Sequence, residues 1–134
     1  MAPPDSLLNS APMTDFILVP SRVPEAVQRL IALPAFARSR RFAYLHDEDL
    51  ELSTVVAGAF GSFLSEPATS QADADAALAL LDELASWDDR DVDGILMVGV
   101  IESIDPEPLA RLRPMMGKRL QWLVDEVEEF WSSP

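Results

Sequence analysis

Hydrophobic positions recur with the period of an α-helix along most of this chain. After residue 22, apolar residues stand three and four positions apart in several successive segments, which is the pattern of helices that bury one face. Prolines such as Pro34, Pro67 and Pro106 separate these segments, and proline is unfavourable inside a helix. The pattern therefore predicts helices of roughly ten to eighteen residues joined by short connections.

Three segments carry the clearest apolar stripes. Their stripe residues are Leu52, Val55, Val56, Ala59, Phe60, Phe63 and Leu64; then Ala77, Leu80, Leu81, Leu84 and Trp87; and finally Met116, Leu120, Leu123, Val124, Val127, Phe130 and Trp131. We expect these side chains to face the core. Ser70 precedes the second segment as a cap, and Pro114 opens the third. Gly58 and Gly61 weaken the first helix, which indicates that another helix approaches it closely.

The segment after the second stripe fits two interpretations. Its apolar residues are Val92, Ile95, Leu96, Val98, Ile101 and Ile104. A strand from Ile95 to Ile101 is one alternative, because β-branched residues are dense there. We favour a helix, because acidic residues lead the segment and the helical spacing continues to Ile104.

These elements predict an all-α fold, an antiparallel bundle of about five to six helices. Consecutive helix pairs also resemble a small helical-repeat stack, although the sequence has no internal repeat. We expect a disordered tail over residues 1–14, which are rich in Pro, Ser and Ala, followed by a single helical domain over residues 15–134.

The composition excludes several classes of protein. The chain has no cysteine, so it has neither disulfides nor thiolate sites. The N-terminal "MAPPDSLLNSAPMTDF" has no basic residue before its apolar patch, unlike a secretory signal. No apolar run is long enough to span a membrane. We therefore expect a cytoplasmic protein that does not associate with membranes.

The negative charge is concentrated in the middle of the sequence. The formal net charge is −13, and residues 42–110 hold sixteen acidic residues against one arginine. Such a field disfavours nucleic acid, whose phosphates need clustered Lys and Arg. It favours a basic protein partner. The alternative is a solvated acidic surface that keeps the protein soluble.

The stretch "WDDRDVDGILMVGVI" begins like a calcium-binding loop. Asp89, Asp91 and Asp93 take its first, third and fifth positions and a glycine follows. The twelfth position, which needs a bidentate carboxylate, is Val100. We therefore expect no metal here, and interpret Asp88 or Asp89 as a helix cap.

Catalytic patterns are lacking as well. His46 is the only histidine and stands beside an acidic run, but no nucleophile or metal-ligand pattern accompanies it. We expect neither an enzyme nor a cofactor. The residues that we expect to bind a partner are the acidic residues at two helix junctions and an adjoining tryptophan: Asp47, Glu48, Asp49, Glu51, Trp87, Asp88, Asp89, Asp91 and Asp93.

The C-terminal two thirds resemble a known class of protein. The order "ALLDELASWDDRDVDGILMVGVIESI", a short spacer and "PMMGKRLQWLVDEVEEFW" is similar to small acidic helical immunity proteins of bacterial polymorphic toxin systems. The resemblance covers roughly residues 45–132 and rests on an acidic turn, a basic joint with proline and a terminal "E..FW". It implies an antitoxin that binds and occludes a cognate toxin. A helical scaffold or adaptor subunit is the alternative, and an enzyme that uses His46 comes third.

Overall fold

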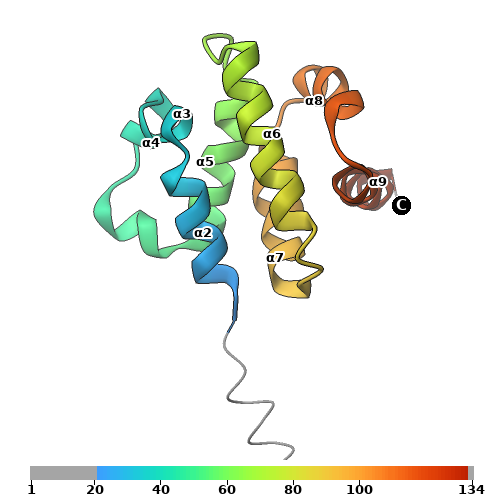
Figure 1. The fold of residues 1–134 in the computed structure, drawn as a ribbon, viewed down its shortest axis with the longest axis horizontal. Helices are drawn as coiled ribbons and strands as arrows, with labels where there is room; N and C mark the ends of the chain where they lie inside the picture. Colours follow the sequence, from blue (N-terminus) through green and yellow to red (C-terminus); the bar gives the residue numbers. More distant parts are fainter. Residues whose placement is uncertain (1–20, 133–134) are drawn as a thin grey trace, which may run out of the picture.

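The computed structural model describes residues 21–132 as helices joined by short turns, and this part of the chain contains no strand (Figure 1). The α-helices are α2 (Val23–Ala32), α3 (Pro34–Ala37), α4 (Arg40–Ala43), α5 (Ser53–Ser65), α6 (Gln71–Ala85), α7 (Arg90–Ile95), α8 (Pro106–Leu112) and α9 (Lys118–Ser132). The other turns are the 3₁₀ turns η1 (Asp47–Glu51), η3 (Ile101–Ser103) and η4 (Arg113–Met115), and the π-helical turn η2 (Leu96–Val100). The predicted tail, residues 1–14, lies outside the described residues.

The all-α prediction is confirmed, and residues 95–101 are helical. Helix α7 continues into η2 and η3 without a break. With this run counted as one helix, residues 21–132 form six longer helical runs, while α3 and α4 are single turns. The predicted number of five to six helices therefore describes the longer elements.

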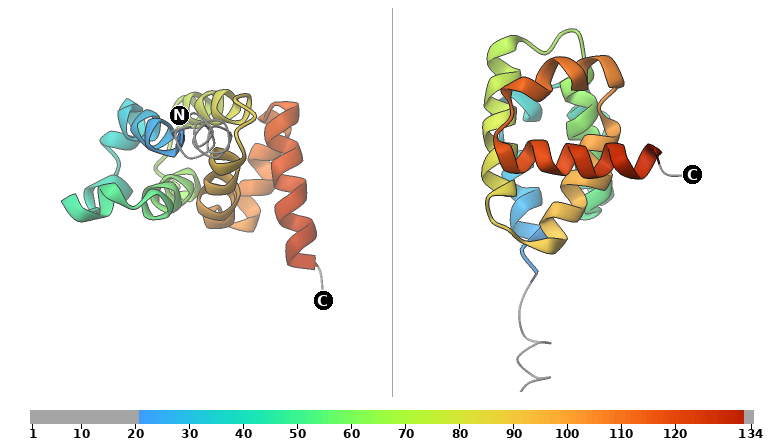
Figure 2. Two further views of the ribbon diagram at one scale, coloured as in Figure 1. Left: turned by 90° about the horizontal axis from the view of Figure 1, so that it is seen from below. Right: turned by 90° about the vertical axis from the view of Figure 1, so that its right-hand side faces the viewer.

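Helices α2, α5 and α6 and the α7–η3 run stand side by side, and α9 crosses part of this set. In Figure 1, α5 and α6 run in opposite directions, and the α7–η3 run returns beside α6. Helix α2 packs against both α5 and α6. Helix α9 departs from this antiparallel order and lies across α6 and η2 (Figure 2).

Local sequence signals explain most helix ends. The Ser70 hydroxyl accepts a hydrogen bond from the Asp73 backbone N–H at 3.1 Å, as a cap does. Pro34 separates α2 from α3. The prediction that Pro114 opens the last helix is wrong, because α9 begins only at Lys118. Before it, the Gly117 backbone N–H donates to Asp82 Oδ1 of α6 at 2.9 Å, which fixes the turn that precedes α9.

Helices α5 and η2 approach so closely that only glycine fits at two positions. A Cβ atom on Gly61 would lie 2.2 Å from the Val100 carbonyl oxygen, and one on Gly99 would lie 2.4 Å from the Ala57 Cβ. The close approach predicted from Gly61 is therefore confirmed. Gly58 is less restricted, since its Cβ would meet Ser103 Oγ at 3.4 Å. Gly99 carries the same constraint, although the sequence did not single it out.

One continuous hydrophobic core joins the helices, with buried side chains from Ala26 in α2 to Val127 in α9. An aromatic cluster forms its N-terminal part. The ring centroids of Phe36 and Phe60 lie 4.9 Å apart, and Phe63 lies 5.7 Å from each of them. Edge-to-face contacts of this kind stabilise a core beyond simple burial. They attach the short α3–α4 segment to α5.

Five residues of the predicted stripes are exposed instead of buried: Leu52, Val55, Val98, Phe130 and Trp131. Leu52 precedes α5 as its N-cap residue, outside the packed helix. Val98 lies on the outer side of the π turn, because Gly99 and Val100 take the inner side. Phe130 and Trp131 lie in the last turn of α9, which extends beyond the other helices (Figure 2).

Alanine substitutions at a crowded glycine and at an open one should change the stability in opposite directions. We expect Gly61→Ala to lower the free energy of unfolding by about 1–3 kcal/mol, because the new methyl group meets backbone atoms that cannot move aside. Gly94→Ala is the matched control, since its Cβ would meet nothing within 4 Å. It should raise the stability by up to about 1 kcal/mol through helix propensity. Urea denaturation measures both, and equal stabilities of the two variants would contradict the close packing.

Candidate partner-binding surfaces

Many of the charged side chains neutralise one another through ion pairs between arginines and carboxylates. All five arginines of residues 21–41 form ion pairs, and seven of the ten basic residues do so in residues 21–132. Of the sixteen acidic residues between 42 and 110, five are paired with arginine: Glu66, Asp73, Glu83, Asp88 and Asp93. The other eleven form no ion pair in the described part of the chain. Within residues 42–110, the unpaired negative charge therefore resides on these eleven carboxylates.

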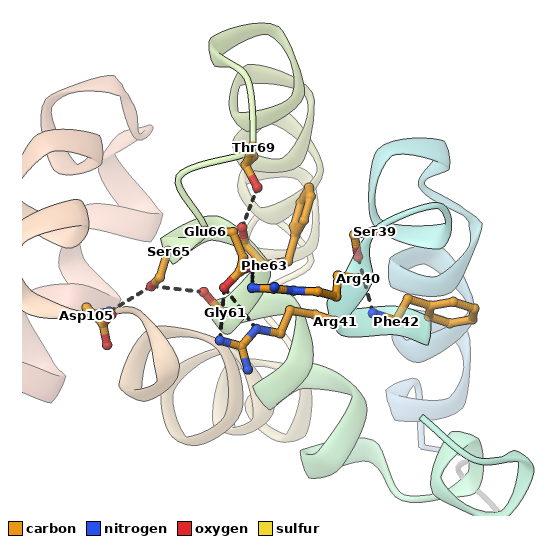
Figure 3. A network of polar contacts seen from close by, with 10 residues as sticks. All are labelled: Ser39, Arg40, Arg41, Phe42, Gly61, Phe63, Ser65, Glu66, Thr69 and Asp105. Carbon is orange, nitrogen blue, oxygen red and sulfur yellow. Dashed lines mark hydrogen bonds and ion pairs between the residues drawn. The ribbon is translucent and has the colours of Figure 1, made fainter. Parts of the chain in front are cut away.

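Glu66 is the most enclosed of the paired acids outside α7 (Figure 3). Its carboxylate lies between Arg40, at 2.6 Å, and Arg41, at 2.9 Å, and its side chain is only 14% exposed. Hydrogen bonds from Arg41 and Arg40 lower the pKa of Glu66 below its ordinary value of 4.5. The contact ties α4 to the end of α5, so we interpret it as structural.

An open groove of about 490 Å³ adjoins this contact, between α3 and the loop that joins α5 to α6. Its charged lining residues are Arg38, Arg40, Glu66 and Asp73. They pair with one another, Arg38 with Asp73 and Arg40 with Glu66. Each charged side chain of the groove is therefore already paired within the protein. For this reason we do not regard the groove as a site for a charged ligand.

The first predicted cluster lies on η1, and we call it the η1 acids: Asp47, Glu48, Asp49 and Glu51. Asp49 has a structural role, because Asp49 Oδ2 accepts the His46 backbone N–H at 2.9 Å and so caps the turn. The other three side chains are exposed and form no ion pair in the described residues. Exposed apolar side chains flank the turn, namely Tyr44 at 65% and Leu52 at 52% exposure.

The second predicted cluster lies at the turn between α6 and α7, and we call Asp88, Asp89 and Asp91 the α6–α7 acids. Asp88 has a positive φ of 52°, a conformation that Asp tolerates better than most residues. This reverses the chain after α6. Asp89 then caps α7, because its Oδ1 accepts the backbone N–H groups of Asp91 at 3.0 Å and Val92 at 3.1 Å. The predicted cap is therefore confirmed.

Asp93 was predicted to contact a partner, but the structure places it inside. Its side chain is 10% exposed, and its Oδ2 accepts a hydrogen bond from Arg119 of α9 at 2.5 Å. The same Arg119 nitrogen lies 3.2 Å from Asp88. Asp93 therefore holds α9 against α7, and Asp88 places the α6–α7 acids beside α9.

Trp87 is also less available than the sequence suggested. It is half-buried, and the Arg22 guanidinium carbon lies 3.7 Å from its ring centroid. Trp122 of α9 is the more exposed tryptophan at this edge, at 47%. Arg119 lies over its ring at 4.6 Å, so Trp122 adjoins Asp88 through a shared arginine.

The two clusters do not form one surface. Figure 1 shows η1 at one side of the fold and the turn between α6 and α7 at the other, with α2 between them. Only the α6–α7 acids adjoin α9, whose exposed residues include Trp122, Phe130 and Trp131; the sequence pattern assigned the last two to the core. The acidic residues that precede Phe130 are the signal that could have identified the exposed end of α9.

Two further findings bear on sites of other kinds. Among residues 21–132, no group of three or more His, Asp and Glu side chains is arranged to hold a metal ion. No helix in this range combines the length and the apolar character that crossing a membrane requires.

The Glu66 contact predicts an acid-dependent loss of stability. Because the pKa of Glu66 is lower in the fold than its ordinary 4.5, the carboxylate stabilises the protein above that pH. This contribution is lost as the pH falls through the folded-state pKa. We expect Glu66→Gln to be less stable than the parent at pH 7, with the difference disappearing in acid.

Denaturant titrations from pH 7 to pH 3 measure this effect. Glu102→Gln is the matched control, since Glu102 is exposed and forms no ion pair in the described chain. Its stability should follow that of the parent at every pH. A Glu66→Gln difference that stays constant down to pH 3 would contradict the role of the ionised carboxylate.

The comparisons with known proteins give no family assignment. No family model matches this sequence, and no curated protein or solved structure matches it. The resemblance to immunity proteins therefore rests on the sequence stretches alone.

Proposed function

We propose that this chain is an immunity protein, an antitoxin that binds a cognate bacterial toxin and covers a basic surface of it. The observation that carries the proposal is the imbalance of charge after folding. Seven of the ten basic residues are paired within the chain, while eleven carboxylates of residues 42–110 form no ion pair in residues 21–132. A surface of this kind complements a cationic one.

Occlusion requires no chemistry from this chain. A toxin that acts on RNA, DNA or a nucleotide has an electropositive cleft for its substrate, since phosphate recognition needs positive charge. Carboxylates on the inhibitor speed the encounter with that cleft at low ionic strength. Exposed aromatic side chains at the same edge then slow dissociation, because they bury large apolar areas.

The α6–α7 acids are the better candidate for this contact. They adjoin Trp122 through Arg119, so charge and an exposed aromatic ring lie at one edge. The cytoplasm is the compartment in which we expect such an inhibitor to act, because it protects the cell that makes the toxin.

Co-expression tests the function directly. The toxin domain encoded beside this chain's gene should stop growth, and the chain should restore growth and co-purify with that domain. A toxic neighbour whose effect persists in the presence of the chain would contradict the proposal. A stable complex with a different, non-toxic partner would instead favour a scaffold or adaptor.

Matched charge variants test the surface. We expect Asp88→Asn, Asp89→Asn and Asp91→Asn together to slow association with the toxin domain roughly tenfold at low salt. Asparagine keeps the helix cap and tolerates the positive φ, so the fold should persist. The control changes three η1 acids, Asp47→Asn, Glu48→Gln and Glu51→Gln, and leaves the capping Asp49 intact.

Stopped-flow association kinetics between about 20 and 300 mM salt separate the two surfaces, because screening removes steering at high salt. The control set should change the association rate by less than the first set. Equal slowing by both sets would show that net charge acts without a defined contact, and would remove the α6–α7 acids from the interface.

A further inference from the structure

Helix α9 exposes more aromatic surface than its packing requires. Its buried residues are Leu120, Leu123, Val124 and Val127. Outside this buried set, Trp122 is 47% and Phe130 is 74% exposed. Trp131, at 49%, is exposed as well. Isolated exposed apolar residues are normal on proteins, but three large aromatic side chains on one helix of fifteen residues form a surface that could bury substantial area.

Trp122 and Phe130 belong to one row with a carboxylate between them. Trp122, Glu126 and Phe130 stand four residues apart, so they lie along the same side of the helix. We call these three residues the α9 row. Glu126 is exposed and forms no ion pair within residues 21–132. The neighbouring Asp125 and Glu128 differ, since both pair with Arg113.

The row continues into the α6–α7 acids. Arg119 lies over the Trp122 ring and reaches Asp88, whose side chain is 86% exposed. An open hollow of about 300 Å³ lies at this junction, and its lining includes Met97, Trp122 and Asp88, as well as the basic Arg90 and Arg119. From Phe130, the row thus leads through Glu126 and Trp122 to Arg119, which Asp88 and Asp93 pair with at the turn between α6 and α7.

Charge decides which occupant fits this face. A second copy of the chain would bring another net charge of −13 to a row that already contains the unpaired Glu126, and like charges at close range oppose association. A cationic segment meets the opposite situation. Its Lys or Arg side chains can pair with Glu126 and lie on the aromatic rings, while its apolar residues cover Trp122 and Phe130.

We propose that the α9 row is the docking surface for an amphipathic, cationic segment of a partner protein. This inference deepens the proposed function and rests on it in one respect, since the partner in the cell would be the toxin. The aromatic residues supply the slowly released anchor, and the α6–α7 acids supply the steering charge.

A defined probe tests the surface without the toxin. The probe is a synthetic helical peptide that carries lysine on one side and leucine on the other, titrated into the full chain by calorimetry. A second peptide with glutamate in place of lysine serves as its control. We expect the lysine peptide to bind and the glutamate peptide to fail.

Two matched double variants locate the binding site. Glu126→Gln with Phe130→Ala should weaken binding of the lysine peptide about tenfold or more, since buried aromatic anchors dominate such contacts. Glu51→Gln with Leu52→Ala removes one carboxylate and one exposed apolar side chain at η1, and should change the affinity by less than about twofold. All four side chains are exposed, so both variants should remain folded.

Three results would overturn the docking surface: no binding of the lysine peptide, equal weakening by both variants, or a dimer in sedimentation that the Phe130 variant dissociates. The last result would identify a second copy as the occupant. The growth assay separates this inference from the proposed function. Peptide binding without rescue from the toxin removes the immunity function only, whereas rescue without row-dependent binding removes the docking surface only.

Discussion

The contact between α5 and the π turn η2 is the constraint on which the rest of the fold depends. Gly61 and Gly99 leave no room for a Cβ atom, so the two backbones meet almost directly. This contact fixes the α7–η3 run against α5. Helix α9 in turn packs across η2 and α6, and Asp93 holds Arg119 at that crossing. The position of the α9 row therefore follows from a contact between small residues in the core.

Ion pairing decides which of the many acids remain available to a partner. The arginines of the N-terminal segment reach across the fold, Arg29 to Glu83 and Arg40 to Glu66. The Arg29–Glu83 pair is exposed on both sides and adds little stability by itself, whereas Glu66 is enclosed; both contacts neutralise positive charge that a partner would otherwise meet. The acids without an ion pair in the described residues include those of η1 and, at the turn between α6 and α7, Asp89 and Asp91, and only the turn adjoins exposed aromatic rings on α9.

Sequence periodicity predicted what depends on local chemistry. The helical stripes, the Ser70 and Asp89 caps and the close approach at Gly61 all follow from residue type and spacing. Periodicity could not show that the last turn of α9 extends beyond the helices it packs against, so Phe130 appeared to belong to the core. It also could not show that Asp93 turns inward, because the arginine that receives it lies 26 residues later in the chain. The partner surface depends on such long-range contacts, and for that reason the sequence located only part of it.

A double-mutant cycle between Ala57 and Gly99 tests the central contact most directly. Gly99→Ala places a methyl group 2.4 Å from the Ala57 Cβ, and Ala57→Gly removes the atom that it meets. We predict that each single variant has a lower free energy of unfolding than the parent. The loss in the double variant should be smaller than the sum of the two single losses by about 1 kcal/mol or more. Free energies that add to within about 0.5 kcal/mol would contradict the account, because they would show that the two helices do not meet at these residues.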